Sequence, residues 1–216
     1  DHLQTNDKRM TPLAFAALYG RLELVKLFVR HGADPGEPIL WPAWGRWPNQ
    51  IPLLAIAAQH GGLEVVRYLV EEKNAPVTQP VIGVENDPLW VAAKYGNIEV
   101  AKYLIGKGAK VDAVCIDTGP STSDYKYWKE RSLSCLGVAS RYGHRSMVEL
   151  LLDSGARIPD GIEKILSHPI LHADHNGYEE IVELFEAHGY SFGVSSPLRE
   201  RDSFQEYYSP AIDKKD

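Results

Sequence analysis

The sequence has no excess of positive charge and no long apolar run. Its formal net charge is −6 at pH 7 and its pI is about 5.8, so it lacks the basic footprint of proteins that bind nucleic acids or anionic membranes. No apolar run approaches the ~20 residues that a bilayer-spanning helix needs. We therefore expect no nucleic-acid partner and no membrane span in this segment.

Cysteine is also scarce, because Cys115 and Cys135 are the two cysteines in 216 residues. They are too far apart in sequence for a C-x-x-C pair, and the sequence holds no N-x-S/T glycosylation site. These absences favour reduced thiols and a reducing compartment over a disulfide between the two residues. The sequence thus predicts an intracellular protein, cytoplasmic or nuclear.

Motifs of catalytic and cofactor-binding sites are missing as well. There is no G-x-S-x-G elbow, no H-E-x-x-H, no G-x-G-x-x-G and no Walker loop. The stretch GKGAK at Gly106–Lys110 lacks the Ser or Thr of a phosphate-binding loop, and we interpret it as structural. We predict no cofactor, no metal and no catalytic residue, and we lean against an enzyme.

What the sequence does contain is a unit that recurs five times. In its clearest copy, Asp87–Asp112, two apolar series at helical spacing are separated by Gly96 and end at Gly108. Pro88 suits a first helical position, and both glycines can adopt the positive φ that ends a helix. The glycines between the two series align the copies: Gly20, Gly61, Gly96, Gly143 and Gly177. Each copy therefore predicts a helix-turn-helix pair.

These copies resemble the ankyrin repeat family, whose unit runs roughly T-P-L-H-x-A-A-x-x-G-H-x-E-x-V-x-x-L-L-x-x-G-A-D. The first copy reads TPLAFAALYGRLELVKLFVRHGAD at residues 11–34, and the third reads DPLWVAAKYGNIEVAKYLIGKGAK from Asp87. The resemblance implies an all-α fold, an ankyrin-repeat solenoid of stacked helix-turn-helix units with extended hairpin finger loops. It says less about function, because such a solenoid hosts many functions.

The resemblance also divides the chain into a repeat domain at residues 1–192 and a C-terminal tail at residues 193–216. We expect the tail to dock on the last repeat rather than to remain flexible. The expected repeats lie at about 7–35, 51–76, 86–112, 133–158 and 167–192, with insertions at 36–50 and 113–131.

Both ends of the array depart from the family pattern. In the last unit, Asp174, Glu179 and Glu186 replace apolar residues, which predicts a terminal cap beyond which nothing stacks. At the other end, Asn6–Met10 reads like the hairpin that precedes a unit, and Asp1 falls where a preceding unit would end. An upstream repeat is therefore an open alternative.

None of the five units keeps the histidine that follows the first helical leucine in the family. Its positions are occupied by Ala14, Ala55, Trp90, Gly137 and Leu171. Because this histidine commonly ties the loops together in resembling proteins, we expect the loops to be held differently here.

The two insertions are rich in aromatic residues. The candidate residues of the first insertion are Trp41, Trp44 and Trp47, and those of the second are Tyr125 and Trp128. Trp90, which starts the first helix of the unit between the insertions, is a further candidate. Rigid aromatic side chains offer a large contact area at low entropic cost, so they could form a binding surface or wall a pocket. The other interpretation is that these aromatic residues form a small local hydrophobic core that keeps each insertion folded.

A second candidate surface comes from the positions just before each turn glycine, which point into the concave groove in resembling proteins. The candidate residues there are Tyr19, His60, Lys94, Tyr95, Arg141 and Tyr142. Such residues suit a peptide, an acidic side chain or a flat organic ligand. Packing against neighbouring side chains is the alternative.

His168, His172 and His175 have a spacing that could bind a divalent metal on an uninterrupted helix. Pro169 argues against this site, because it predicts that His168 is a capping residue outside the helix. We therefore interpret the three as ordinary surface or cap histidines.

The favoured function is a monomeric protein–protein interaction scaffold, which binds another protein or peptide through the concave groove and the aromatic finger loops. The alternative is a protein that binds an apolar small molecule, or an isomerase, cyclase or hydrolase, with a pocket between the two loops. A third hypothesis is a repeat segment of a larger channel or effector.

Overall fold

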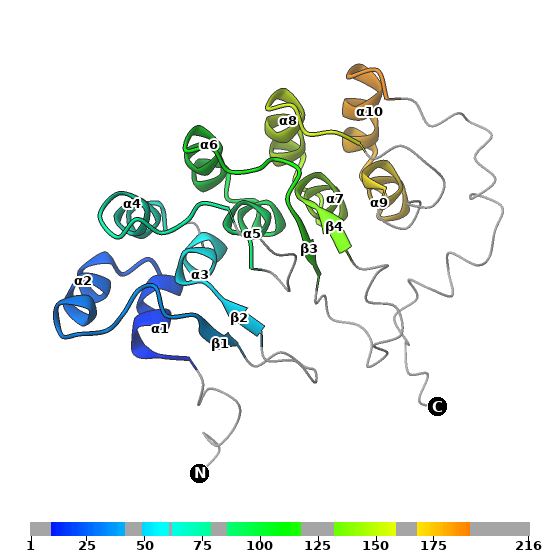
Figure 1. The fold of residues 1–216 in the computed structure, drawn as a ribbon. Helices are drawn as coiled ribbons and strands as arrows, with labels where there is room; N and C mark the ends of the chain where they lie inside the picture. Colours follow the sequence, from blue (N-terminus) through cyan, green and yellow to red (C-terminus); the bar gives the residue numbers. More distant parts are fainter. Residues whose placement is uncertain are drawn as a thin grey trace, which may run out of the picture.

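The chain forms a row of helix pairs in a computed structural model (Figure 1). The structure describes residues 10–41, 49–60, 62–78, 86–117, 132–158 and 168–190. In chain order the helices are α1 (Pro12–Leu18), α2 (Leu22–Arg30), α3 (Leu53–Gln59), α4 (Leu63–Glu71), α5 (Pro88–Tyr95), α6 (Ile98–Gly106), α7 (Cys135–Arg141), α8 (Arg145–Asp153), α9 (Pro169–His175) and α10 (Glu179–Ala187). The predicted solenoid of stacked helix-turn-helix units is confirmed.

The helices lie in two layers (Figure 1). The first helices of the pairs, α1, α3, α5, α7 and α9, pack each against the next and form the inner layer. The second helices, α2, α4, α6, α8 and α10, form the outer layer in the same order. Among the described residues, each pair therefore packs mainly against its immediate neighbours, as expected for a solenoid.

Side-chain caps explain where several inner helices begin. The side chain of Thr11 accepts a hydrogen bond from the Ala14 N–H at the start of α1. Asp87 does the same for α5, and Ser134 for α7. Each cap satisfies backbone donors that have no partner within the helix. At the other end of α5, Gly96 has φ 70°, the left-handed conformation that the sequence predicts for it.

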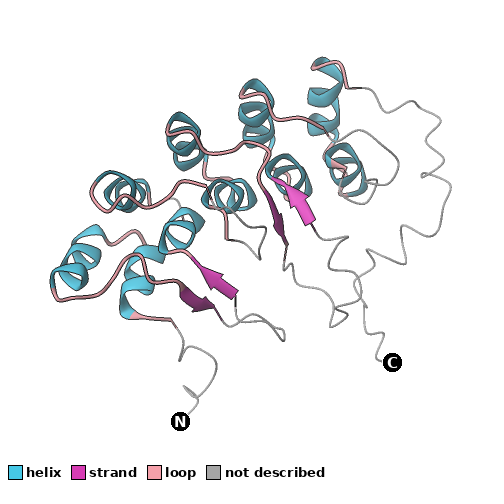
Figure 2. Cartoon of the chain, in the orientation of Figure 1, coloured by secondary structure: helices cyan, strands magenta, loops and turns pink. Residues whose placement is uncertain are grey.

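Two short hairpins extend from the inner side of the row (Figure 2). Strand β1 (Ile39–Trp41) pairs antiparallel with β2 (Asn49–Ile51), with Ile39 opposite Ile51. Strand β3 (Val114–Ile116) pairs antiparallel with β4 (Ser132–Ser134), with Cys115 opposite Leu133. The two predicted insertions therefore begin as β-ladders. Residues 42–48 and 118–131 lie outside the described part of the chain, and so do residues 1–9 and 191–216, which include the predicted tail.

The core is continuous along the array and is built from alanines and leucines. Ala17, Ala58 and Ala93 occupy equivalent positions of three successive inner helices, and all three are fully buried. A one-carbon side chain lets neighbouring helix backbones approach closely. Leu89 and Leu104 fill the space between the two layers of the third pair, and neither is exposed to solvent.

We expect Leu104→Ala to lower the free energy of unfolding by about 2–5 kcal/mol, because it leaves a cavity at a fully buried site. Chemical denaturation followed by circular dichroism would measure the loss. Leu24→Ala is the matched control, because Leu24 is 46% exposed and its truncation leaves no cavity. Equal losses for the two variants would contradict the packing described above.

Candidate functional site

Three of the predicted groove residues form a line of exposed rings along the inner helices. Tyr19, His60 and Tyr95 stand at the ends of α1, α3 and α5, and we call them the aromatic row. Tyr19 is 57% exposed and Tyr95 is 39% exposed. The rings of Tyr19 and His60 lie with centroids 5.7 Å apart, and the side-chain amide of Gln59 donates to the Tyr95 hydroxyl at 3.0 Å. The row therefore spans three consecutive repeats, with Tyr19 next to His60 and with Tyr95 held by Gln59, the neighbour of His60 in sequence.

Next to this row, the remaining groove residues converge on one buried carboxylate. Asp117 follows β3 directly and is 1% exposed. Lys94 Nζ lies 2.9 Å from Asp117 Oδ1, and an Arg141 guanidinium nitrogen lies 3.3 Å from Oδ2. The Tyr142 hydroxyl reaches both carboxylate oxygens at 3.3 Å. We call Lys94, Asp117, Arg141 and Tyr142 the Asp117 cluster.

Lys94 is surrounded by aromatic rings as well as by this carboxylate. Its ammonium lies 5.8 Å from the ring centroid of Trp90, 5.7 Å from that of Tyr95 and 5.6 Å from that of Tyr142. A cation over an aromatic face is attracted to it, more strongly where water is excluded. Lys94 is only 8% exposed. The prediction that Lys94 presents its charge in the groove is therefore wrong, because the ammonium is held inside the cluster.

The surroundings of Tyr142 also favour a neutral hydroxyl. Burial and the negative charge of Asp117 raise the pKa of Tyr142 above its ordinary value. A tyrosine hydroxyl is protonated at neutral pH in any case, and the raised pKa keeps Tyr142 a hydrogen-bond donor to Asp117 to higher pH. Arg141 is the more accessible cation of the cluster, with 26% of its side chain exposed.

Trp90 is placed differently from the prediction. Its side chain is fully buried, and the indole N–H donates to the carbonyl oxygen of Leu133 on β4 at 2.8 Å. Trp90 therefore cannot wall an open binding surface, and that prediction is wrong. The indole occupies the position of the family histidine and ties its own helix to the next hairpin. The expectation that the loops are held differently is thus confirmed at this site.

Five aromatic candidates cannot be placed in a site. Trp44, Trp47, Tyr125 and Trp128 lie outside the described residues, and Trp41 is described as part of β1 without its side chain. A binding surface or pocket between the two finger loops stays a prediction.

One structural element of the groove was missed at the sequence level. In the third and fourth repeats, the residue after the turn glycine reaches back to the preceding repeat. Asn97 Nδ2 donates to the carbonyls of Ala58 and Gln59, at 2.6 and 2.8 Å. His144 Nε2 donates to the carbonyl of Lys94 at 2.9 Å. The sequence signal for these contacts was the polar residue directly after the turn glycine, Asn97 in the third repeat and His144 in the fourth. These contacts fix the spacing of the residues that face the groove.

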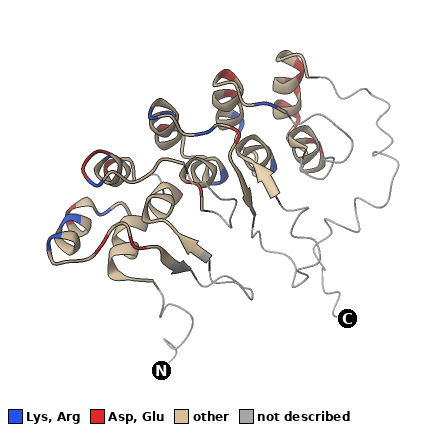
Figure 3. Cartoon of the chain, viewed as in Figure 1, with Lys and Arg blue, Asp and Glu red and all other residues tan. Residues whose placement is uncertain are grey.

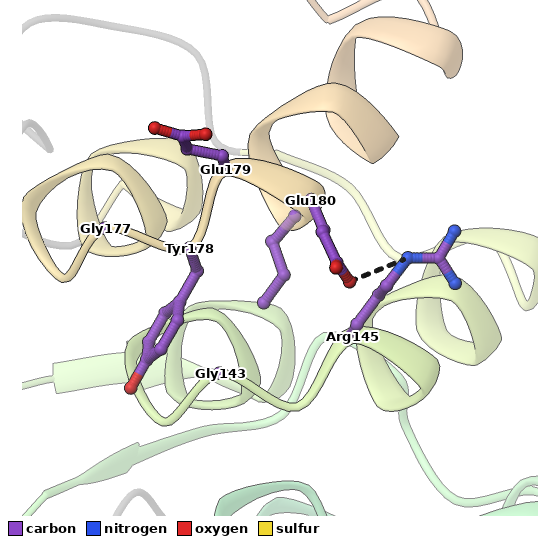
Figure 4. Close-up of a pocket in the computed structure, with 7 residues that line it drawn as sticks. Gly143, Arg145, Gly177, Tyr178, Glu179 and Glu180 are labelled. Atoms are coloured by element: carbon purple, nitrogen blue, oxygen red, sulfur yellow. Dashed lines mark ion pairs between the residues drawn. The ribbon is translucent and has the colours of Figure 1, made fainter.

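A pocket of about 340 Å³ lies at the turns of the fourth and fifth pairs (Figure 4). It is lined by Gly143, Arg145, Gly177, Tyr178, Glu179, Glu180 and Ile181. Arg145 approaches Glu180 at 4.0 Å across it. This pocket is made by helix turns and is not the predicted one between the finger loops.

The histidines and cysteines have structural positions. His168 is the N-cap of α9, as Pro169 predicts, and burial lowers the pKa of His168. In the part of the chain that the structure describes, no three His, Cys, Asp or Glu side chains are arranged to hold a metal ion. Cys115 and Cys135 are both buried. Burial, followed by the charge of Asp87, raises the pKa of Cys135, which opposes a role as a nucleophile.

The architecture is that of a repeat solenoid, and comparisons with known proteins identify its kind. Family models described as "Ankyrin repeats (3 copies)", "Ankyrin repeats (many copies)" and "Ankyrin repeat" match residues 45–115, 89–152 and 8–37. The chain belongs to the ankyrin repeat family. Ankyrin repeats are generally protein–protein interaction modules. No helix within the described ranges is long and apolar enough to cross a membrane.

Two similar proteins illustrate the relationship. The crystal structure of the human ASB11 ankyrin repeat domain superposes with a TM-score of 0.62 at 23% identity, covering 84% of this chain and 71% of that one. "Ankyrin repeat and KH domain-containing protein mask-1" of Caenorhabditis elegans is 23% identical over 190 residues. This match covers 84% of the chain but spans only 6% of the length of that relative. The similarity extends to the fold and not to a particular partner.

We expect Asp117→Asn to lower the free energy of unfolding by about 3 kcal/mol, because it removes the buried negative charge that faces Lys94 and Arg141. Glu99→Gln is the matched control. Its partner Lys102 lies 3.2 Å away in an exposed ion pair, whose loss should cost about 0.5 kcal/mol or less. Urea denaturation of the two variants would show the difference, and a loss for Asp117→Asn no larger than the control would refute the structural role of the cluster.

Proposed function

We propose that the chain is a protein-interaction module that binds a polypeptide across the inner side of the array, through the aromatic row and the adjoining Arg141. The observation that carries the proposal is the exposure of Tyr19 and Tyr95. These rings stand at the same position of different repeats as His60, in a line, where packing does not require large side chains. Tyrosine, histidine and arginine together offer apolar contact and hydrogen bonds, as at many binding hot spots.

The proposal includes the chemistry of the partner. A segment with apolar or aromatic side chains would lie along Tyr19, His60 and Tyr95, and an acidic group would meet the accessible edge of Arg141. The finger loops, with Trp41, Trp44, Trp47, Tyr125 and Trp128, would add contacts where they flank the groove. The scarcity of cysteine, two in 216 residues, supports an intracellular location for this function. No described residue favours the small-molecule alternative.

A peptide library displayed on phage and selected on the intact chain tests the proposal. For selected peptides, we expect Tyr19→Ala/Tyr95→Ala to weaken binding by about thirtyfold or more, as removal of hot-spot aromatics does. Tyr103→Ala on the outer helix α6 is the matched control and should leave affinity unchanged. Circular dichroism would verify that both variants are folded. Peptides that bind the double variant as tightly as the unmodified chain would exclude the groove as the binding surface.

A further inference from the structure

The pocket between the turns of the fourth and fifth pairs lies where two charged residues interrupt the repeat pattern. Each outer helix begins at the second residue after the turn glycine. In the first three repeats this residue is apolar, partly buried and packed against the core: Leu22, Leu63 and Ile98. In the fourth and fifth repeats it is Arg145 and Glu179, both exposed and both lining the pocket.

The cap at the end of the array does not account for Arg145. This residue belongs to the fourth repeat, whose outer helix α8 packs against α6 on one side and α10 on the other. An arginine here gives up the apolar contact that the earlier repeats make, and it also stands at the positive end of the α8 dipole. Departures that cost stability in the interior of an ordered array are expected at functional sites.

One wall of the pocket is the ring of Tyr178, which is held in place by a glycine. A Cβ atom at Gly143 would lie only 2.7 Å from this ring, so the ring lies directly against the backbone of the preceding turn (Figure 4). Tyr178 nevertheless remains 36% exposed. An aromatic side chain that is fixed on one side and open on the other offers a preformed surface to a cation.

The other wall carries a carboxylate that is only partly neutralised. Glu180 is 83% exposed, and its nearest printed partner, Arg145, lies 4.0 Å away. The same guanidinium lies closer to Glu149, at 3.5 Å, and Glu179 adds a further carboxylate to the lining. Acidic residues also mark the rest of α10 (Figure 3). The charge around the pocket is therefore negative and suits a cationic group.

We propose that this pocket binds a lysine or arginine side chain of the polypeptide that lies along the groove. The inference rests on the function proposed above and adds a second charged group to the partner. The aliphatic stem would lie along the Tyr178 ring and over Ile181, and the charged head would meet Glu180. The volume of about 340 Å³ is at the low end of the ~300–1,000 Å³ of ligand pockets, as suits one side chain.

The position of the pocket sets the order of the partner's groups. Gly143, which lines the pocket, directly follows Arg141 and Tyr142 of the Asp117 cluster. Neighbouring helices lie about 8–10 Å apart, a distance that an extended chain crosses in about three residues. An acidic residue at Arg141 and a basic residue in the pocket should therefore stand about three positions apart, with the apolar part of the partner beyond the acidic one.

The probes are phage-displayed peptides, selected on the intact chain, whose binding is weakened by Tyr19→Ala/Tyr95→Ala. We expect them to carry a Lys or Arg about three positions from an acidic residue. Replacing this residue by norleucine, which keeps the stem and removes the charge, should weaken binding about tenfold in fluorescence anisotropy, since an ion pair and a cation–π contact are lost. In Glu180→Gln, the same replacement should cost at most about threefold, because only the ring contact remains.

The matched control is Glu183→Gln, which removes the same charge from an exposed position of α10 outside the pocket lining. With this variant the norleucine replacement should again cost about tenfold. Groove-binding peptides that carry no basic residue, or that bind equally well with norleucine, would overturn the proposal and leave the proposed function intact. An acidic residue at this place in the peptides would make Arg145 the binding group and would also overturn it.

A second measurement tests the pocket even if no peptide depends on the aromatic row. Nα-acetyl-lysine methylamide is titrated at millimolar concentration into the 15N-labelled chain. We expect shifts of the Gly143 and Gly177 amide signals, and none in Glu180→Gln or with the norleucine analogue. Unchanged signals in the unmodified chain would refute the site. Shifts that appear only after deletion of residues 193–216 would assign the pocket to that segment and would overturn the proposal.

Discussion

A pair of short helices cannot bury both of its apolar faces, and this constraint governs the whole array. The neighbouring pair must supply the missing half of each core, so the inner helices pack in sequence through alanines such as Ala17, Ala58 and Ala93. Because this packing fixes the register of successive repeats, the residues at the helix ends form a line. The alignment of the rings in the aromatic row is thus a consequence of the core packing of the inner helices.

The Asp117 cluster attaches the start of the irregular second insertion to the regular repeats. Asp117 belongs to the end of β3, whereas its partners Lys94 and Arg141 belong to α5 and α7. The carboxylate therefore joins the root of the insertion to two consecutive inner helices. Trp90 adds a second tie, from α5 to the carbonyl of Leu133 on β4. The beginning and the end of this insertion are both anchored to the groove.

The helix pairs of the repeats could be predicted from the sequence, whereas the positions of Trp90 and Lys94 could not, for physical reasons that can be named. The turn glycines and Pro88 predicted the helix pairs because their effect is local. The roles of Trp90 and Lys94 depend on Leu133 and Asp117, which lie 43 and 23 residues away, and repeat alignment carries no information about such contacts. Asp117 could have been recognised by the alternation of β3, since it lies two residues after the buried Cys115.

The two layers of the array are joined to their neighbours in different ways. Successive inner helices meet through buried alanines, whereas outer helices α2, α4 and α6 also meet through long side chains such as Lys26 over Tyr68 and Arg67 over Tyr103. Close-packed small side chains hold a fixed spacing, but long side chains can change rotamer and follow a change in spacing. We therefore expect that a change in the spacing of the repeats is taken up by the outer layer, while the inner layer keeps its spacing.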